Sequence, residues 1–106
     1  VVGVLTARVG SIGDNGFGGW YSYRASKAAA NQIVRTAAIE IARKRKNAIV
    51  VALHPGTVAT SFTDDYPNHP KVSPEAAAKN ILAVLDGLES SDTGNFFDWA
   101  ARPVPW

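Results

Sequence analysis

Two side chains with complementary chemistry, Tyr23 and Lys27, lie four residues apart in the sequence. In a helix this spacing places the phenol and the ammonium group on one face, about 5–6 Å apart at Cβ. A free phenol has a pKa of about 10, and a neighbouring cation favours the phenolate and lowers that pKa. Such a pair could exchange protons during the interconversion of carbonyl compounds and alcohols. The spacing alone equally fits a surface tyrosine beside a solvated lysine.

The elements that must position this pair alternate between strands and helices. Apolar runs at 1–5 and 48–53 predict buried strands, and 95–99 predicts a short third strand. Apolar periodicity predicts a helix over about 22–45, and Ser73-Pro74-Glu75 predicts the start of a second helix that ends before Gly87. This alternation is typical of a parallel sheet covered by helices, so the predicted fold class is α/β.

Within the 22–45 helix, an apolar residue recurs at every fourth position. We expect these residues to form a narrow buried stripe made of Ala25, Ala29, Ile33, Ala37 and Ile41. Residues 8–20 contain five glycines and 61–72 contain two prolines, so both segments are predicted to be loops.

Composition excludes several classes of function. The 106 residues suffice for one small domain, and the absence of cysteine excludes disulfides and cysteine-based zinc sites. The net charge of +2 arises from charges of mixed sign, so the basic run Arg43–Lys46 is interpreted as a solvated helix end and not as a nucleic-acid site. Asp64-Asp65 is interpreted as exposed loop charge, and no metal is expected. No apolar run approaches the roughly 18 residues of a membrane span, so a cytoplasmic protein is expected.

The motifs together resemble a known family. The Tyr23–Lys27 helix, the strand after it and His54–Thr60 resemble the C-terminal half of a short-chain dehydrogenase/reductase. The segments YSYRASKAAAN, LHPGTV and FFDW…PVPW are most similar to the subgroup of the C-factor signalling protein and the sniffer-type carbonyl reductases. The resemblance spans essentially the whole chain and implies part of a doubly wound Rossmann-type sheet, with three strands and the helices between them.

The N-terminal dinucleotide-binding half of that family is missing from this sequence. Gly16-Phe17-Gly18 begins a glycine motif, but Tyr21 stands where its last glycine would be. The chain also begins with Val1 and contains no Met. We therefore expect 1–106 to be a single partial domain, the catalytic and C-terminal half of a longer protein, and to be inactive alone.

The resemblance implies an oxidoreductase that uses NAD or NADP and acts on a small carbonyl or alcohol substrate. Tyr23 would donate or accept the proton, and Lys27 would assist it and hydrogen-bond the nicotinamide ribose. The residues implied to contact the cofactor are Tyr23, Lys27, Pro55, Gly56, Val58 and Thr60. Residues 61–72 correspond to a substrate lid, on which Phe62, Tyr66 and His69 could contact substrate.

The family's third catalytic group is a serine hydroxyl, for which the sequence offers two candidates. Thr6-Ala7 stands where the family commonly has two serines, and Ala7 has no hydroxyl. Ser11 lies 12 residues before Tyr23, close to the usual separation, so we predict Ser11 with Thr6 as the alternative. Ser11 could instead cap a turn. If neither hydroxyl reaches the substrate, the alternative function is a non-catalytic signalling or binding protein on the same fold.

Further predictions concern His54, two tryptophans and the 22–45 helix. His54, at a strand end, is interpreted as a packed, hydrogen-bonded residue. Trp99 and Trp106 are expected to pack at the sheet edge or at a subunit contact. Homo-oligomers are usual in the family, and the 22–45 helix is a candidate interface.

Overall fold

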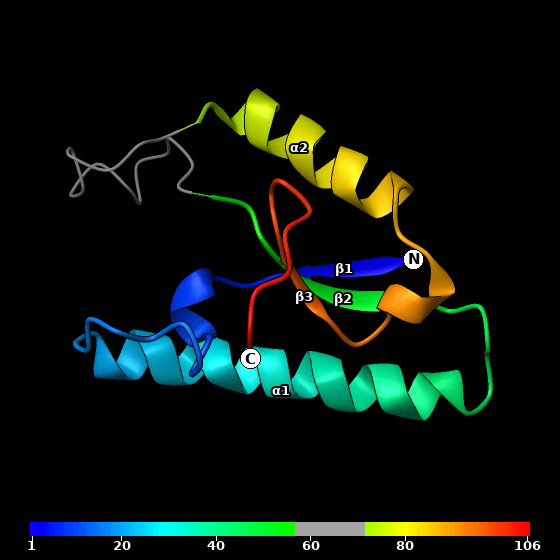
Figure 1. Ribbon diagram of the computed structural model, residues 1–106, viewed down its shortest axis with the longest axis horizontal. Coiled ribbons are helices and arrows are strands. Elements are labelled where there is room, and N and C mark those ends of the chain that lie inside the picture. Colours follow the sequence, from blue (N-terminus) through cyan, green and yellow to red (C-terminus); the bar gives the residue numbers. More distant parts are fainter. Residues whose placement is uncertain (57–71) are drawn as a thin grey trace.

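The computed structural model describes residues 1–56 and 72–106. It has three layers, with a sheet between helix α1 on one side and helix α2 on the other (Figure 1). The elements are β1 (Val2–Leu5), η1 (Arg8–Gly10), α1 (Tyr21–Ala42), β2 (Val50–His54), α2 (Pro74–Asp86), η3 (Ser90–Asp92) and β3 (Phe96–Asp98). Every strand and helix predicted from the sequence is present, so the α/β prediction is confirmed. The segment predicted as a plain loop at 8–20 begins with the 3-10 turn η1.

The sheet is parallel, with the strand order β1-β2-β3. Leu5 pairs with Leu53, and His54 pairs with Asp98. Because the strands run in one direction, their carboxyl ends meet at one edge of the sheet. Ligands bind at this edge in open α/β folds.

The central strand β2 divides the core between the two helix layers. Val50 and Ala52 pack on the α1 side with Val34, Ala38, Phe96 and Val104. Ile49, Val51 and Leu53 pack on the α2 side with Val84 and Phe97. This alternation follows from the two-residue period of a strand, and it explains why β2 is apolar on both faces.

Helix α2 begins as its sequence predicts. The Oγ of Ser73 accepts a hydrogen bond from the N–H of Ala76 at 3.1 Å, and Pro74 and Glu75 occupy the first turn. The helix ends at Asp86, directly before Gly87. The capping prediction is confirmed.

The buried stripe predicted for α1 is wrong. The residues of α1 that are buried are Asn31, Val34 and Ala38, whereas Ile33 is 68% exposed and Ile41 is 37% exposed. Both sets of residues recur with a helical period, and small apolar residues occur on more than one face of this helix. Periodicity therefore established the helix but could not say which face packs on the sheet.

Candidate active site

The proposed acid/base pair lies in the first two turns of α1. The Nζ of Lys27 is 5.8 Å from the centroid of the Tyr23 ring, within the range of a cation–π contact. Tyr23 is 39% exposed. The structure thus places the two side chains together, as the four-residue spacing predicts.

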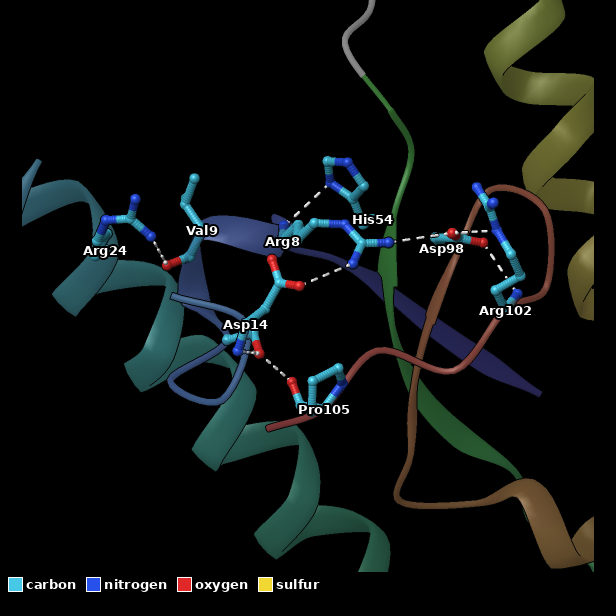
Figure 2. A network of polar contacts seen from close by, with 9 residues as sticks. Arg8, Val9, Asp14, Arg24, His54, Asp98, Arg102 and Pro105 are labelled. Carbon is cyan, nitrogen blue, oxygen red and sulfur yellow. Dashed lines mark hydrogen bonds and ion pairs between the residues drawn. The ribbon is translucent and has the colours of Figure 1, made fainter. Parts of the chain in front are cut away.

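The loop between β1 and α1 packs directly against the turn that carries Lys27. A Cβ on Gly10 would lie 2.7 Å from the carbonyl carbon of Lys27, so only glycine permits this approach. The hydroxyl of Thr6 donates to the carbonyl oxygen of Lys27 at 3.5 Å. Arg24 also donates to the carbonyl oxygen of Val9, at 3.4 Å (Figure 2). The loop that carries both candidate hydroxyls therefore lies beside the Tyr23–Lys27 pair.

The hydroxyl of Ser11 has partners inside the protein. Ser11 is 1% exposed, and its Oγ donates to the carbonyl oxygen of Pro105 and accepts from the N–H of Asp14. In the part of the chain that the structure describes, no hydrogen bond joins Ser11 to Tyr23. A substrate oxygen would have to replace the Pro105 carbonyl as the acceptor of this hydroxyl.

A buried carboxylate lies at the end of β3. Asp98 is fully buried, and its oxygens accept hydrogen bonds from the backbone N–H groups of Ala100 and Arg102, each at 2.9 Å. The guanidinium groups of Arg102 and Arg8 complete its coordination at 2.9 and 3.2 Å. Burial alone would raise the pKa of Asp98, but the hydrogen bonds from Arg102 and Ala100 outweigh it and hold that pKa below its ordinary value.

Arg8 joins this carboxylate to the other strand ends (Figure 2). Its backbone N–H donates to Nδ1 of His54 at 3.1 Å, and its Nη1 donates to Asp14 at 3.3 Å. Because Nδ1 is an acceptor, the neutral imidazole of His54 carries its proton on Nε2. Burial, followed by the positive charge of Arg8, lowers the pKa of His54 below its ordinary value. We refer to Arg8, Asp14, His54, Asp98 and Arg102 as the Asp98 cluster.

The turn after β2 favours glycine at position 56. Gly56 has φ of 81°, a conformation that favours glycine, and it is partly exposed together with Pro55. A Cβ on Gly56 would lie 3.1 Å from the indole of Trp99, so a side chain here would crowd the turn. The other predicted cofactor contacts, Val58 and Thr60, lie outside the described residues. So do Asp64-Asp65 and the lid residues Phe62, Tyr66 and His69.

Sequence reasoning named Trp99 only as a packing residue at the sheet edge or a subunit contact, and it missed Asn31. Trp99 follows β3 directly and lies against Gly56, which the parallel order of β2 and β3 could have indicated. Asn31 is 3% exposed, and its amide has no hydrogen-bond partner within residues 1–56 and 72–106. Asn31 follows Tyr23 and Lys27 at the same four-residue spacing, which is the signal that could have identified it.

Two classes of site are not found among the described residues. No helix there is long and apolar enough to cross a membrane. No group of three or more His, Asp or Glu side chains there could hold a metal ion.

Comparison with known proteins identifies the family. The family model described as short chain dehydrogenase matches residues 7–71, more than half of the chain. The chain belongs to the short chain dehydrogenase family. The matched range contains the Tyr23–Lys27 pair, the Asp98 cluster residues Arg8 and His54, and the Gly56 turn.

Two curated relatives match most of this chain. The 1-hydroxy-2-glutathionyl-2-methyl-3-butene dehydrogenase of Rhodococcus sp. (strain AD45) is 44% identical over 96 residues, which are 90% of this chain and 42% of that protein. The C-signal of Myxococcus xanthus is 37% identical over 102 residues, which are 96% of this chain and 58% of that protein. The chain therefore spans about half the length of the curated relatives it matches.

Solved structures show the same arrangement of elements. The carbonyl reductase Sniffer of D. melanogaster superimposes with a TM-score of 0.83 at 27% identity, over 98% of this chain and 41% of that one. The NADPH-bound carbonyl reductase from chicken fatty liver also has a TM-score of 0.83, at 31% identity, over 96% of this chain and 41% of that one. The three parallel strands and their helices are thus part of the Rossmann-type fold of this family, and the resemblance inferred from the sequence is confirmed.

Proposed function

We propose that this chain is the catalytic part of an NAD- or NADP-dependent oxidoreductase acting on a small carbonyl or alcohol substrate. The observation that carries the proposal is the Lys27 ammonium group 5.8 Å from the Tyr23 ring, beside the carboxyl ends of the strands. Residues 1–106 would be the catalytic and C-terminal half of one domain, in the cytoplasm. The NADPH-bound carbonyl reductase from chicken fatty liver supports the choice of cofactor.

The protein residues would position the substrate and move the proton. The phenol of Tyr23 would give its proton to the carbonyl oxygen during reduction and take it back during oxidation. The positive charge of Lys27 would stabilise the phenolate, and its ammonium group would also donate to the nicotinamide ribose. Bound NAD(P)H would supply the hydride. The conformation of Gly56 fits the close approach of the nicotinamide along Pro55 and Gly56, with Val58 and Thr60 as further contacts.

A hydroxyl of the β1–α1 loop would polarise the substrate carbonyl. We assign this role to Ser11, because it lies 12 residues before Tyr23 and directly after Gly10, which packs against the Lys27 turn. Thr6 is the alternative, because its hydroxyl donates to the Lys27 carbonyl oxygen. The Ser11 hydroxyl would exchange the Pro105 carbonyl for the substrate oxygen. Comparing Ser11→Ala with Thr6→Val in the assay below would separate the two residues.

The test is NAD(P)H oxidation by the full-length protein with a panel of aldehydes, ketones and quinones. Tyr23→Phe removes only the hydroxyl, and loss of proton transfer should lower kcat by about 10²–10⁴-fold. Tyr21→Phe is the matched control, because Tyr21 is 88% exposed and lies two residues away on the same helix. Equal activity of the two variants would contradict the proposal. The 106-residue chain alone should show no turnover in the same assay.

A second function has specific support. The C-signal of Myxococcus xanthus is 37% identical, Ala7 has no hydroxyl, and the Ser11 hydroxyl has protein partners. These observations favour a signalling or binding protein that keeps the fold without turnover. Cofactor binding by the full-length protein, without reduction of any substrate in the panel, would establish this alternative.

We further propose that the protein forms homo-oligomers through the 22–45 helix. The support is the apolar side of α1 that does not face the sheet, where Ala25, Ala29 and Ile33 are exposed. Sedimentation velocity of the full-length protein would contradict the proposal if it gave a single species of monomer mass.

A further inference from the structure

The ion pair between Arg8 and Asp98 joins two strands that do not pair with each other. Arg8 follows β1 and Asp98 ends β3, while β2 lies between these strands in the sheet. The Nη2 of Arg8 nevertheless donates to Asp98 at 3.2 Å, across the carboxyl end of β2. The backbone N–H of Arg8 also contacts His54, the last residue of β2. Arg8, which comes after β1 in the chain, therefore contacts the carboxyl ends of both β2 and β3 (Figure 2).

Arg8 is not needed to neutralise Asp98. Without Arg8, the carboxylate would keep the guanidinium of Arg102 and two backbone N–H donors, which are provided by Ala100 and Arg102 themselves. These three donors all come from the turn that follows β3. The contact from Arg8 therefore adds little to the neutralisation of the charge, and its distinct effect is to attach the β1–α1 loop to β3.

The attached loop is the one that borders the proposed acid/base pair. Gly10, two residues after Arg8, packs against the backbone of Lys27. Asp14 accepts from Arg8 through its carboxylate and donates from its backbone N–H to Ser11 at 3.0 Å. The loop is thus held between β3 on one side and α1 on the other, so a shift of Arg8 would shift Gly10 and Ser11 relative to Lys27.

We propose that Arg8 is a positioning residue of the site. Through its ion pair with Asp98, it holds the β1–α1 loop against the Lys27 turn and so sets the distance between the loop hydroxyls and Tyr23. This inference rests on the proposed function. A misplacement of about 1 Å can lower the rate of an enzyme by about 10²-fold, so contacts of this kind affect kcat without touching substrate.

The test compares Arg8→Gln with Arg102→Gln in the full-length protein. Both substitutions remove a guanidinium from the same carboxylate, but Arg102 forms no hydrogen bond or ion pair with the β1–α1 loop among the described residues. Arg8→Gln should lower kcat about tenfold or more, and Arg102→Gln should leave it within about twofold. The KM for the cofactor should change little in either variant. Arg8→Lys should recover part of the activity, because a single ammonium can still reach Asp98.

Amide hydrogen exchange of residues 9–14 provides a readout that needs no activity. Exchange should be faster in Arg8→Gln than in Arg102→Gln at equal global stability. Unchanged exchange in Arg8→Gln, or losses of kcat that follow only the melting temperature in both variants, would overturn the positioning role. Absence of turnover in the wild-type protein would overturn the proposed function instead, and the exchange data alone would then decide whether Arg8 holds the loop.

Discussion

The two outer strands of the sheet have the same partner and very different environments. Both β1 and β3 pair in parallel with β2. All three residues of β3 are buried, whereas Val2 and Leu5 of β1 are 54% and 57% exposed. The N–H of Val104 donates to Phe96 at 2.8 Å, and Trp106 stacks on Phe96 with ring centroids 5.4 Å apart. In the described residues, no strand pairs with the other edge of β1.

This difference shows that apolar composition does not make a strand buried. Both strands are mainly apolar, but β3 is covered by the chain that follows it, whereas in β1 only Val4 is partly buried. An open strand edge offers unpaired N–H and C=O groups to another strand. The proposed dinucleotide-binding half would cover this edge. Residues on the β3 side should therefore contribute most to the free energy of unfolding. The positions of the site residues should depend on the β1–α1 loop.

The largest expected difference in the free energy of unfolding is between the substitutions Phe96→Ala and Leu5→Ala in this 106-residue chain. Phe96 is 1% exposed, so its truncation should lower the free energy of unfolding by about 3–5 kcal/mol. Leu5→Ala should cost less than about 0.5 kcal/mol, because the side chain is largely solvated. Urea unfolding followed by circular dichroism measures both values.

The same two substitutions in the full-length protein test whether the difference between β1 and β3 depends on a further strand. If a further strand covers β1 there, the cost of Leu5→Ala should rise to about 2 kcal/mol or more. Similar costs for Leu5→Ala and Phe96→Ala in the 106-residue chain would show that the two edges do not differ.

A smaller effect is expected at the loop that holds β1 to α1. The Cβ of Gly10→Ala would meet the Lys27 backbone at 2.7 Å, so the loop must move, at a cost of about 1–3 kcal/mol. Gly16→Ala is the control on the same loop, because nothing lies within 4 Å of its Cβ position. Thermal unfolding of the full-length variants measures the difference. Equal melting temperatures would show that Gly10 does not set the loop position.

The smallest expected effect is a pH dependence of the free energy of unfolding that arises from His54. The effect is small because it comes from a single, partly exposed imidazole. Burial and Arg8 lower its pKa in the folded protein below 6.5, so the unfolded chain binds more protons in that range. Its contribution to stability is therefore present above pH 6.5 and is lost as the pH falls toward the folded-state pKa. His54→Asn should flatten the stability profile in this window, measured by urea unfolding at a series of pH values. An unchanged dependence of stability on pH in His54→Asn would contradict its assignment to His54.

Much of the fold followed from local patterns. The strand and helix positions were predicted by apolar runs and by the Ser73 cap, since these signals act within a few residues of each other. The proximity of Tyr23 and Lys27 was predicted for the same reason, because helical geometry alone sets their spacing. The catalytic role of that pair stays a prediction.

The remaining features depend on segments that are distant in the chain. The buried face of α1 was predicted wrongly, because helical periodicity does not identify the face that meets the sheet. Arg8 and Asp98 are 90 residues apart, and Ser11 and Pro105 are 94 apart, so no local pattern pairs them. The sequence by itself determined the elements, the family and the Tyr23–Lys27 pair, through short-range geometry and motif order. Only the packing of three parallel strands, which brings their carboxyl ends to one edge, decided that Arg8, His54 and Asp98 meet there.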